Sequence, residues 1–511
     1  MSLVSTGFLV FLLVGVIVYY LIPKKAQWAW LLILSYAYYL CSGYKTVVFI
    51  LLTTIITFTS GILLERTEDN LARSLKAEGL AREDKKALKE KAKTYKKRVA
   101  VIALLLVFGV LAVVKYHNFA IENVNGIIKA FGGNGSISTF TLLLPLGISF
   151  YSFQSISYVI DVYRGKVKAC NNIFKYALFV SYFPQITQGP IGRYDRLAPQ
   201  FLAEHKYDLA VIQHGLQRMA WGLFKKFIIA DRAGVVSDLV FNNPGQYHGI
   251  YVIIGVLAYC AQLYGDFAGG IDMVMGASEM FGIHLDDNFR QPFFSHSIGE
   301  FWRRWHMTLG RFFTRYVYIP LGGNRRGKMR TLCNVMIVML LSGLWHGAAW
   351  TFVLWGFLHG VGMIWDNLEH PHLPKKWMRQ AATFAYVCMT FVFFRAESIA
   401  QGVDVLKSIV SLKWNGFVFQ MASALDMTEC YIITKALSMK LPGLLSWFWL
   451  GIFVVLIAIC FRVLSGEKVS GVVALQRQKG YGRLYPVLLA VLFTWSIISM
   501  TGVSEYLYFS F

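Results

Sequence analysis

Apolar residues occur in long runs along most of the chain, and short polar or basic turns separate the runs. A helix needs about 20 apolar residues to cross the hydrocarbon core of a membrane. The pattern therefore predicts membrane-spanning helices rather than the one-sided helices of a soluble protein. The uninterrupted candidates are residues 3–21, 28–40, 46–64, 99–114, 141–162, 331–365, 380–394, 444–464 and 485–502.

Four runs in the middle of the chain are interrupted by residues that disfavour a lipid-facing helix. Prolines and glycines break residues 173–191, and two lysines lie within 209–239. Two aspartates lie within 250–283, and 293–321 is rich in Arg and Trp. Interrupted helices at membrane depth are tolerated where they line a cavity. We therefore expect an all-α polytopic membrane protein with about eleven transmembrane helices and one or two re-entrant or interfacial helices.

The composition excludes several other classes of protein. Of the 511 residues, 56% are hydrophobic and 15% are charged, whereas a soluble domain carries about a quarter charged residues. A soluble enzyme, a disordered chain and a disulfide scaffold are therefore excluded. None of the seven cysteines lies within four positions of another, which excludes a CxxC metal or redox motif.

The formal net charge is +22, and the cations lie mostly in short segments between apolar runs. The positive-inside rule and anionic lipid headgroups explain this placement better than nucleic acid does. Residues 65–98 hold twelve Lys or Arg and seven Asp or Glu, which predicts a solvated or surface-lying cytoplasmic helix. The N-terminus is then outside, and residues 121–139 form an external loop. The first run lacks a basic n-region, so we expect a retained span rather than a signal peptide.

His346 is the strongest single candidate for chemistry. Residues 331–365 contain no Asp, Glu, Lys or Arg. As one helix they would measure about 52 Å, too long for a core of about 30 Å, so we expect a break at residues 342–347. An ionisable residue inside a membrane is a functional candidate by default, although a core histidine bonded to a carbonyl would look the same. His359 would be rotated away and is interpreted as structural.

A second candidate segment is residues 300–316, which predict one amphipathic helix at the membrane interface. His306 joins the apolar stripe of this helix, and arginines form a second stripe. The segment is either a membrane anchor or a positively charged entrance for an anionic donor. The apolar stripe consists of Trp302, Trp305, Leu309, Phe312 and Tyr316, and the cationic stripe consists of Arg304, Arg311 and Arg315.

Residues 321–329 nearly match the phosphate-loop spacing GxxxxGK. Met329 stands where a Ser or Thr would bind magnesium, and no strand is expected before the loop, so a nucleotide hydrolase is improbable. A basic cytoplasmic loop for headgroups or donor phosphates fits better.

Two further polar segments interrupt apolar runs. Asp266 and Asp272 lie among glycines and could bind a cation, pair with an Arg or hold the fold; structural pairing is favoured. Residues 183–194 predict a kinked polar turn in a cavity wall. No GxSxG elbow, HExxH or zinc-ligand spacing is present, which argues against a hydrolase or metalloenzyme.

Together these motifs resemble the membrane-bound O-acyltransferase (MBOAT) superfamily. They are most similar to its bacterial branch of alginate O-acetylases and peptidoglycan- and cellulose-acetylating relatives, strongly over about residues 110–400. The D-alanine exporters of the teichoic-acid pathway are close cousins. The segments that carry the resemblance are residues 183–190 (FPQITQGP), 264–272 (YGDFAGGID), 291–293 (QPF), 300–306 (EFWRRWH), 318–325 (YIPLGGNR) and 342–347 (SGLWHG).

The resemblance implies an MBOAT fold, with the helices around a central tunnel that crosses the membrane. The essential histidine of the family maps onto His346, and its second, helix-borne histidine maps onto His306. No metal and no bound cofactor are implied. The residues expected to bind the donor or line the tunnel are Trp302, Arg304, Trp305, Asn324, Gln185, Asp266 and Trp345.

The implied function is O-acyl transfer in a bacterial plasma (inner) membrane. An acyl group, expected to be acetyl, comes from acetyl-CoA or an acyl-carrier thioester in the cytoplasm. It passes to an extracytoplasmic acyltransferase partner or directly to a hydroxyl, for O-acetylation of a polysaccharide. The alternatives are acyl or D-alanine export for teichoic acid, and a transporter or lipid scramblase without acyl chemistry. A transporter commonly shows two related halves, and no internal repeat is visible.

The same reasoning divides the chain into three regions. Residues 1–120 are expected to be N-terminal transmembrane helices with the charged segment 65–98, residues 121–400 the MBOAT catalytic core, and residues 401–511 C-terminal transmembrane helices.

Overall fold

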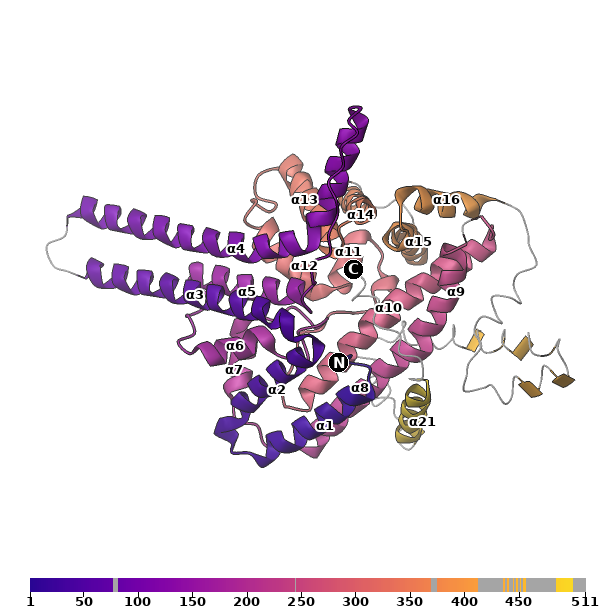
Figure 1. The fold of residues 1–511 in the computed structure, drawn as a ribbon, viewed down its shortest axis with the longest axis horizontal. Helices are drawn as coiled ribbons and strands as arrows, with labels where there is room; N and C mark the ends of the chain where they lie inside the picture. Colours follow the sequence, from indigo (N-terminus) through magenta and orange to yellow (C-terminus); the bar gives the residue numbers. More distant parts are fainter. Residues whose placement is uncertain are drawn as a thin grey trace. The chain divides into compact units, whose positions relative to one another are not determined.

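The computed structural model describes residues 1–76, 81–243, 245–368, 375–411 and 484–499, and isolated residues between 435 and 455. Every regular element in this part of the chain is a helix (Figure 1), so the all-α prediction is confirmed there. Two compact units are present. The first comprises Met1, Val10–Ile212 and Ser278–Asp286, and the second comprises Ser2–Leu9, Gln213–Ala277 and Asp287–Phe511.

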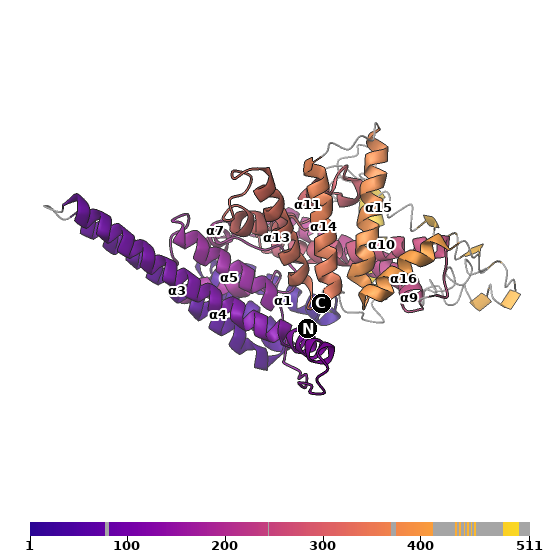
Figure 2. The same ribbon diagram turned by 90° about the horizontal axis from the view of Figure 1, so that it is seen from above.

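The first unit is built around a long pair of helices, α3 and α4, which lie side by side and carry their charged ends beyond the rest of this unit (Figures 1 and 2). Lys96 of α4 lies 2.5 Å from Glu68 of α3. The described residues of the charged segment 65–98 thus form largely exposed extensions of two apolar helices. The helices of this unit are α1 (Thr6–Leu21, from Val10 onward), α2 (Gln27–Ser42), α3 (Val47–Leu75), α4 (Arg82–Ala130), α5 (Ile148–Tyr163), α6 (Ile173–Ser181) and α7 (Tyr194–Leu202).

Two boundaries in the first unit differ from the sequence prediction. The external loop predicted over residues 121–139 is wrong in its first half, because α4 continues to Ala130. Apolar residues at helical spacing sustain the helix, which ends where Gly132 adopts a left-handed φ of 78°. The span predicted over 141–162 begins late, because Gly147 has a left-handed φ of 69° and α5 starts only after it.

The second unit contains the elements that carry the two candidate histidines. In it, α13, α14 and α15 pack side by side (Figure 2). Its elements are α8 (Leu209–Phe224, from Gln213 onward), a π-helical turn (Lys225–Ala230), α9 (Asp231–Phe241), α10 (Ile250–Glu279, up to Ala277), α11 (Ile298–Arg304), α12 (Met307–Phe313), a second π-helical turn (Thr314–Tyr318), α13 (Lys328–His346), α14 (Trp350–Leu368), α15 (Lys376–Arg395), α16 (Ile399–Val410) and α21 (Leu484–Ile498).

Four described helices are long and apolar enough to cross a membrane by themselves. They are Tyr44–Leu75, Arg82–Ala130, Ile250–Glu279 and Lys328–His346. The total of about eleven spans stays a prediction, as does the three-region division of the chain. The predicted span 444–464 and most of the region 401–511 lie outside the described residues.

Candidate functional site

The apolar run 331–365 breaks where the sequence predicted. Helix α13 ends at His346, and α14 begins at Trp350. The two helices pack closely at Gly343. A Cβ added there would lie only 2.3 Å from the carbonyl oxygen of Phe352, so the approach requires glycine. Small residues permit such backbone approach between membrane helices. The break and the close packing fix His346 at the turn of this helical hairpin.

The ring of His346 is buried among aromatic side chains from three helices. Its centroid lies 4.9 Å from Trp345 of α13, 5.1 Å from Trp355 of α14 and 5.2 Å from Phe394 of α15. All three contacts are edge-on, an arrangement that aromatic rings favour. The aromatic walls exclude bulk water from the imidazole.

His306 occupies a break between α11 and α12, outside the four candidate spans. The prediction of one amphipathic helix over residues 300–316 is therefore wrong. His306 adopts φ 43° and ψ 52°, the left-handed conformation, and serves as the N-cap of α12. Such a backbone costs about 1–3 kcal/mol and persists only where surrounding contacts impose it. Those contacts come from Asn288, whose carbonyl oxygen accepts from Met307 N at 3.0 Å.

The side chain of His306 is fully buried. Its Nδ1 lies 3.2 Å from Oδ1 of Asn288, and its Nε2 has no hydrogen-bond partner among the described residues. Rings of Phe267 and Trp345 pack against it, at 4.8 and 5.9 Å between centroids. Burial lowers the pKa of His306 below the ordinary value of a histidine, because desolvation disfavours the charged ring. His306 is therefore a neutral imidazole.

Trp345 connects the two histidines, because its ring contacts both His306 and His346. The third buried histidine of this region, His359, is different. Its Nδ1 accepts from Nε1 of Trp302 at 3.3 Å, and its Nε2 lies 3.0 Å from Oγ1 of Thr390. Both ring nitrogens of His359 are engaged, which agrees with the structural role expected for it.

Trp305 lies at the centre of an aromatic cluster beside His306. Its ring stacks on Phe301 at 5.5 Å and 17° and contacts Phe391 of α15 at 5.5 Å. Arg304, the neighbouring candidate, donates to Glu300 one turn earlier at 2.6 Å and is partly exposed. Trp302 thus contacts His359, and Trp305 contacts Phe267, which packs on His306. Arg304 instead pairs with a residue of its own helix.

The buried carboxylates of α10 are paired, as the sequence analysis favoured. Asp266 lies 2.6 Å from Nζ of Lys226, and Asp272 lies 2.5 Å from Nζ of Lys225 and 3.1 Å from Arg218. The π-helical turn Lys225–Ala230 carries both lysines into the protein. Buried charges are costly unless paired in this way.

Two other predicted site residues lie elsewhere. Gln185 belongs to the first unit, where it is buried and donates to Gln154 at 2.7 Å. Asn324 lies on an exposed turn before α13. Within the described residues, no group of three His, Cys, Asp or Glu side chains could hold a metal ion.

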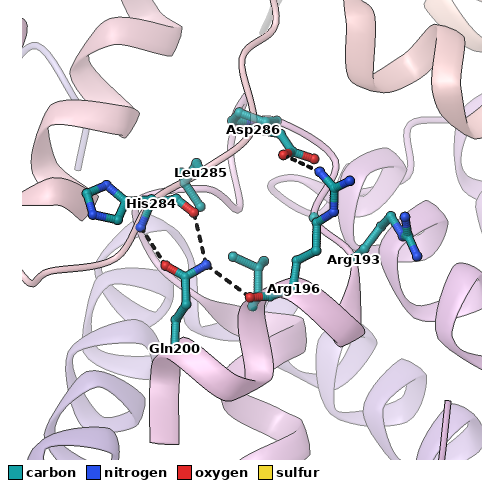
Figure 3. Close-up of a pocket in the computed structure, with 9 residues that line it drawn as sticks. Arg193, Arg196, Gln200, His284, Leu285 and Asp286 are labelled. Carbon is teal, nitrogen blue, oxygen red and sulfur yellow. Dashed lines mark hydrogen bonds and ion pairs between the residues drawn. The ribbon is translucent and has the colours of Figure 1, made fainter. Parts of the chain in front are cut away.

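The first unit contains a pocket of about 280 Å³ beside α7 (Figure 3). Arg196 reaches Asp286 at 2.6 Å, and Gln200 holds the opposite wall by exchanging hydrogen bonds with the backbone of His284, at 2.8 and 3.1 Å. None of the predicted site residues lines it. The lining residues are Pro190, Gly192, Arg193, Arg196, Leu197, Gln200, His284, Leu285 and Asp286.

Sequence reasoning also missed Asn288, which contacts His306, and Thr308, which donates to Asn288. Nothing in a single sequence marks them, since Asn288 lies 18 positions before the histidine and outside the amphipathic pattern.

Comparison with known proteins identifies the part of the chain that contains this site. Residues 170–401 match the model of the membrane-bound O-acyltransferase family. These residues are an MBOAT domain. The domain includes both candidate histidines, the paired carboxylates of α10 and the pocket beside α7, and the resemblance drawn from the motifs is confirmed.

Curated relatives of the chain include members of three groups. A probable alginate O-acetylase of Pseudomonas putida is 42% identical over 297 residues, which is 57% of this chain and 60% of the relative. A peptidoglycan O-acetyltransferase of Helicobacter pylori is 35% identical, over 62% of this chain and 66% of the relative. A teichoic acid D-alanyltransferase of Bacillus subtilis is 29% identical, over 50% and 70%. The aligned part thus spans about 60% of the length of the alginate-type relatives.

Proposed function

We propose that the protein is an O-acyltransferase of a bacterial inner membrane. It takes an acetyl group from a cytoplasmic thioester, acetyl-CoA or an acyl-carrier thioester, and passes it across the membrane for O-acetylation of an extracytoplasmic polysaccharide. An acyltransferase partner outside the membrane receives the group or completes the transfer. The observation that carries this proposal is the pair of buried histidines, His306 and His346, that share the ring of Trp345 within the MBOAT domain.

The chemistry needs a base and a dry site. A hydroxyl oxygen of the acceptor, or of a partner side chain, attacks the thioester carbonyl carbon. Its proton passes to a neutral imidazole, the new C–O bond forms, and the C–S bond breaks. The thiolate leaves with the bonding electron pair and is protonated. Histidine is suited to this task because its ordinary pKa lies near 6.5.

The aromatic side chains around the histidines supply the second requirement. Water that reached the thioester would compete with the hydroxyl and hydrolyse it. Closed sites suppress such side reactions by excluding water. The rings of Trp345, Trp355 and Phe394 enclose His346, and the cluster around Trp305 closes the side of His306.

Acetylation of a polysaccharide is preferred to D-alanyl transfer for teichoic acid because the alginate-type relatives are 40–42% identical, against 29–30% for the D-alanyltransferases. In this proposal the basic segments 65–98 and 325–328 face the cytoplasm and the N-terminus lies outside. The exposed Arg311 then favours an anionic, phosphate-bearing donor by its charge, whereas the charge of Arg304 is paired with Glu300.

The proposal is tested with purified protein in proteoliposomes. Radiolabelled acetyl-CoA, an acetylated carrier protein and a D-alanylated carrier protein are offered separately, and release of free thiol is measured with and without an added polysaccharide. We expect thiol release to require the protein and to be fastest with an acetyl thioester. Transport of a solute or lipid with no thiol release from any donor would favour the transporter alternative and overturn the proposal.

A further inference from the structure

Asn288 makes an unusual set of contacts beside His306. Its Oδ1 lies 3.0 Å from the backbone nitrogen of Thr308, 2.9 Å from Oγ1 of Thr308 and 3.2 Å from Nδ1 of His306. A backbone N–H can only donate a hydrogen bond. The side-chain atom that faces Thr308 N must therefore be the amide oxygen, which fixes the orientation of the Asn288 amide.

The orientation of Asn288 determines where His306 carries its proton. An amide oxygen has no hydrogen to give, so its contact with Nδ1 is a hydrogen bond only if Nδ1 is protonated. A neutral imidazole carries one N–H, and burial keeps this ring neutral. Nε2 of His306 is therefore an unprotonated, buried nitrogen whose lone pair has no partner among the residues described.

His359 provides an internal comparison with the opposite result. The indole N–H of Trp302 can only donate, so Nδ1 of His359 accepts and the proton lies on Nε2, facing Thr390. Both nitrogens of His359 are thus used in holding three helices together. Of these two buried histidines, only His306 keeps a lone pair available.

We propose that Asn288 is a positioning residue of the acyl-transfer site, holding His306 in the tautomer whose Nε2 can accept a proton, alongside the role of His346 in the transfer. This inference rests on the proposed function. Asn288 acts on the segment twice, since its backbone oxygen also accepts from Met307 N at 3.0 Å. Backbone and side chain together impose the left-handed conformation of His306 and orient its ring.

Stability alone does not explain an asparagine at this position. Asn288 is almost completely buried, and its Nδ2 has no hydrogen-bond partner among the described residues. A buried donor without a partner is destabilising. Residues that break a local rule in this manner are typical of functional sites.

The test compares Asn288→Asp with Asn334→Asp, a second buried asparagine of the same unit whose Nδ2 donates to the carbonyl of Gly323 at 2.9 Å. The rate of acetyl transfer from acetyl-CoA is measured from pH 4 to 9, a range extended into acid because burial lowers the pKa of His306. A carboxylate facing the Nδ1–H stabilises the protonated ring of His306, which then loses its proton only at higher pH. The partners of His306 in the native protein are Asn288, Phe267 and Trp345, and none of them carries a charge. The new carboxylate therefore shifts the acid limb of the profile, which is the fall in rate at low pH caused by protonation of His306.

We expect Asn288→Asp to move the acid limb of the profile to higher pH, with the rate recovering toward that of the native protein in alkali. Asn334→Asp should leave the position of the limb unchanged. Asn288→Leu, which removes the orienting oxygen, should lower the rate about 10- to 100-fold at every pH, the effect seen when the group that orients a metal-bound histidine is lost. An unshifted limb in Asn288→Asp would overturn the inference.

A second measurement separates this inference from the proposed function. Solid-state NMR of the native protein with ¹⁵N-labelled histidine, assigned by loss of the signal in His306→Gln, reports the tautomer without any need for activity. A protonated Nδ1 supports the role of Asn288, and a protonated Nε2 overturns it. Absence of acyl transfer by the native protein would instead reject the proposed function, whichever tautomer is observed.

Discussion

His306 and His346 belong to different elements of the second unit, yet both rings pack against the indole of Trp345. The centroid of the His306 ring lies 5.9 Å from that of Trp345, and the centroid of the His346 ring lies 4.9 Å from it. The two imidazoles are therefore separated by no more than the width of one indole contact on each side. The arrangement depends on two breaks in helical structure, one between α11 and α12 and one between α13 and α14. Each break places a histidine at the end or start of a helix.

The α13–α14 hairpin should depend on Gly343. Gly343→Ala puts a Cβ 2.3 Å from the carbonyl oxygen of Phe352, and a backbone atom cannot move aside cheaply. We expect a loss of about 1–3 kcal/mol, the usual cost of overpacking. Gly109→Ala in α4 is the matched control, since nothing lies within 4 Å of its added Cβ. Melting temperatures in detergent should fall for the first variant only, and equal temperatures would refute the tight packing.

The pair of Lys226 and Asp266 should be more costly to break than to replace. Both side chains are 2% exposed. Asp266→Leu removes a fully buried carboxylate 2.6 Å from the Lys226 ammonium, while the partly exposed Asp231 remains 3.0 Å away, and should destabilise the protein by about 3–5 kcal/mol. The double variant Asp266→Leu, Lys226→Met should recover most of that loss. Chemical denaturation in detergent measures both, and a double variant no more stable than the single one contradicts a simple paired role.

The proposed topology is a prediction from the basic segments. Lys91→Cys in α4 and Arg326→Cys before α13 lie on exposed positions, and the positive-inside rule places both in the cytoplasm. In a background without native cysteines, a membrane-impermeant maleimide should label them only after the inner membrane is opened. Labelling of either site from the periplasmic side of intact spheroplasts would reject this orientation.

Local pattern was enough to predict one of the two breaks. Residues 331–365 form too long an apolar run for one span, and glycines flank His346, so length and residue type together located the break. The stripe of Trp302, Trp305 and Leu309 has no such irregularity and favours a continuous helix. Its interruption at His306 comes from Asn288, a tertiary contact that helical periodicity does not report.

The paired carboxylates were likewise predictable only in part from the sequence. Their burial in an apolar run indicated that Asp266 and Asp272 needed cationic partners. The partners include Arg218 and two consecutive lysines. A regular α-helix would place these consecutive residues on different faces. The π-helical turn Lys225–Ala230 carries them to two carboxylates that lie six positions apart. Composition predicted the need for pairing, and only the backbone geometry identifies the pairs.

The central claim is that the buried histidine at the turn of the α13–α14 hairpin takes part in acyl transfer. The most direct measurement is the rate of acetyl transfer from radiolabelled acetyl-CoA by His346→Ala in proteoliposomes, with His117→Ala, a half-buried histidine of α4 outside the aromatic cluster, as the control. Protein amount and monodispersity are matched. The account predicts a fall of about 10²–10⁴-fold, the usual contribution of general acid–base catalysis, with a folded protein and an unaffected control. A folded, monodisperse His346→Ala that transfers acetyl at the rate of the native protein would contradict it.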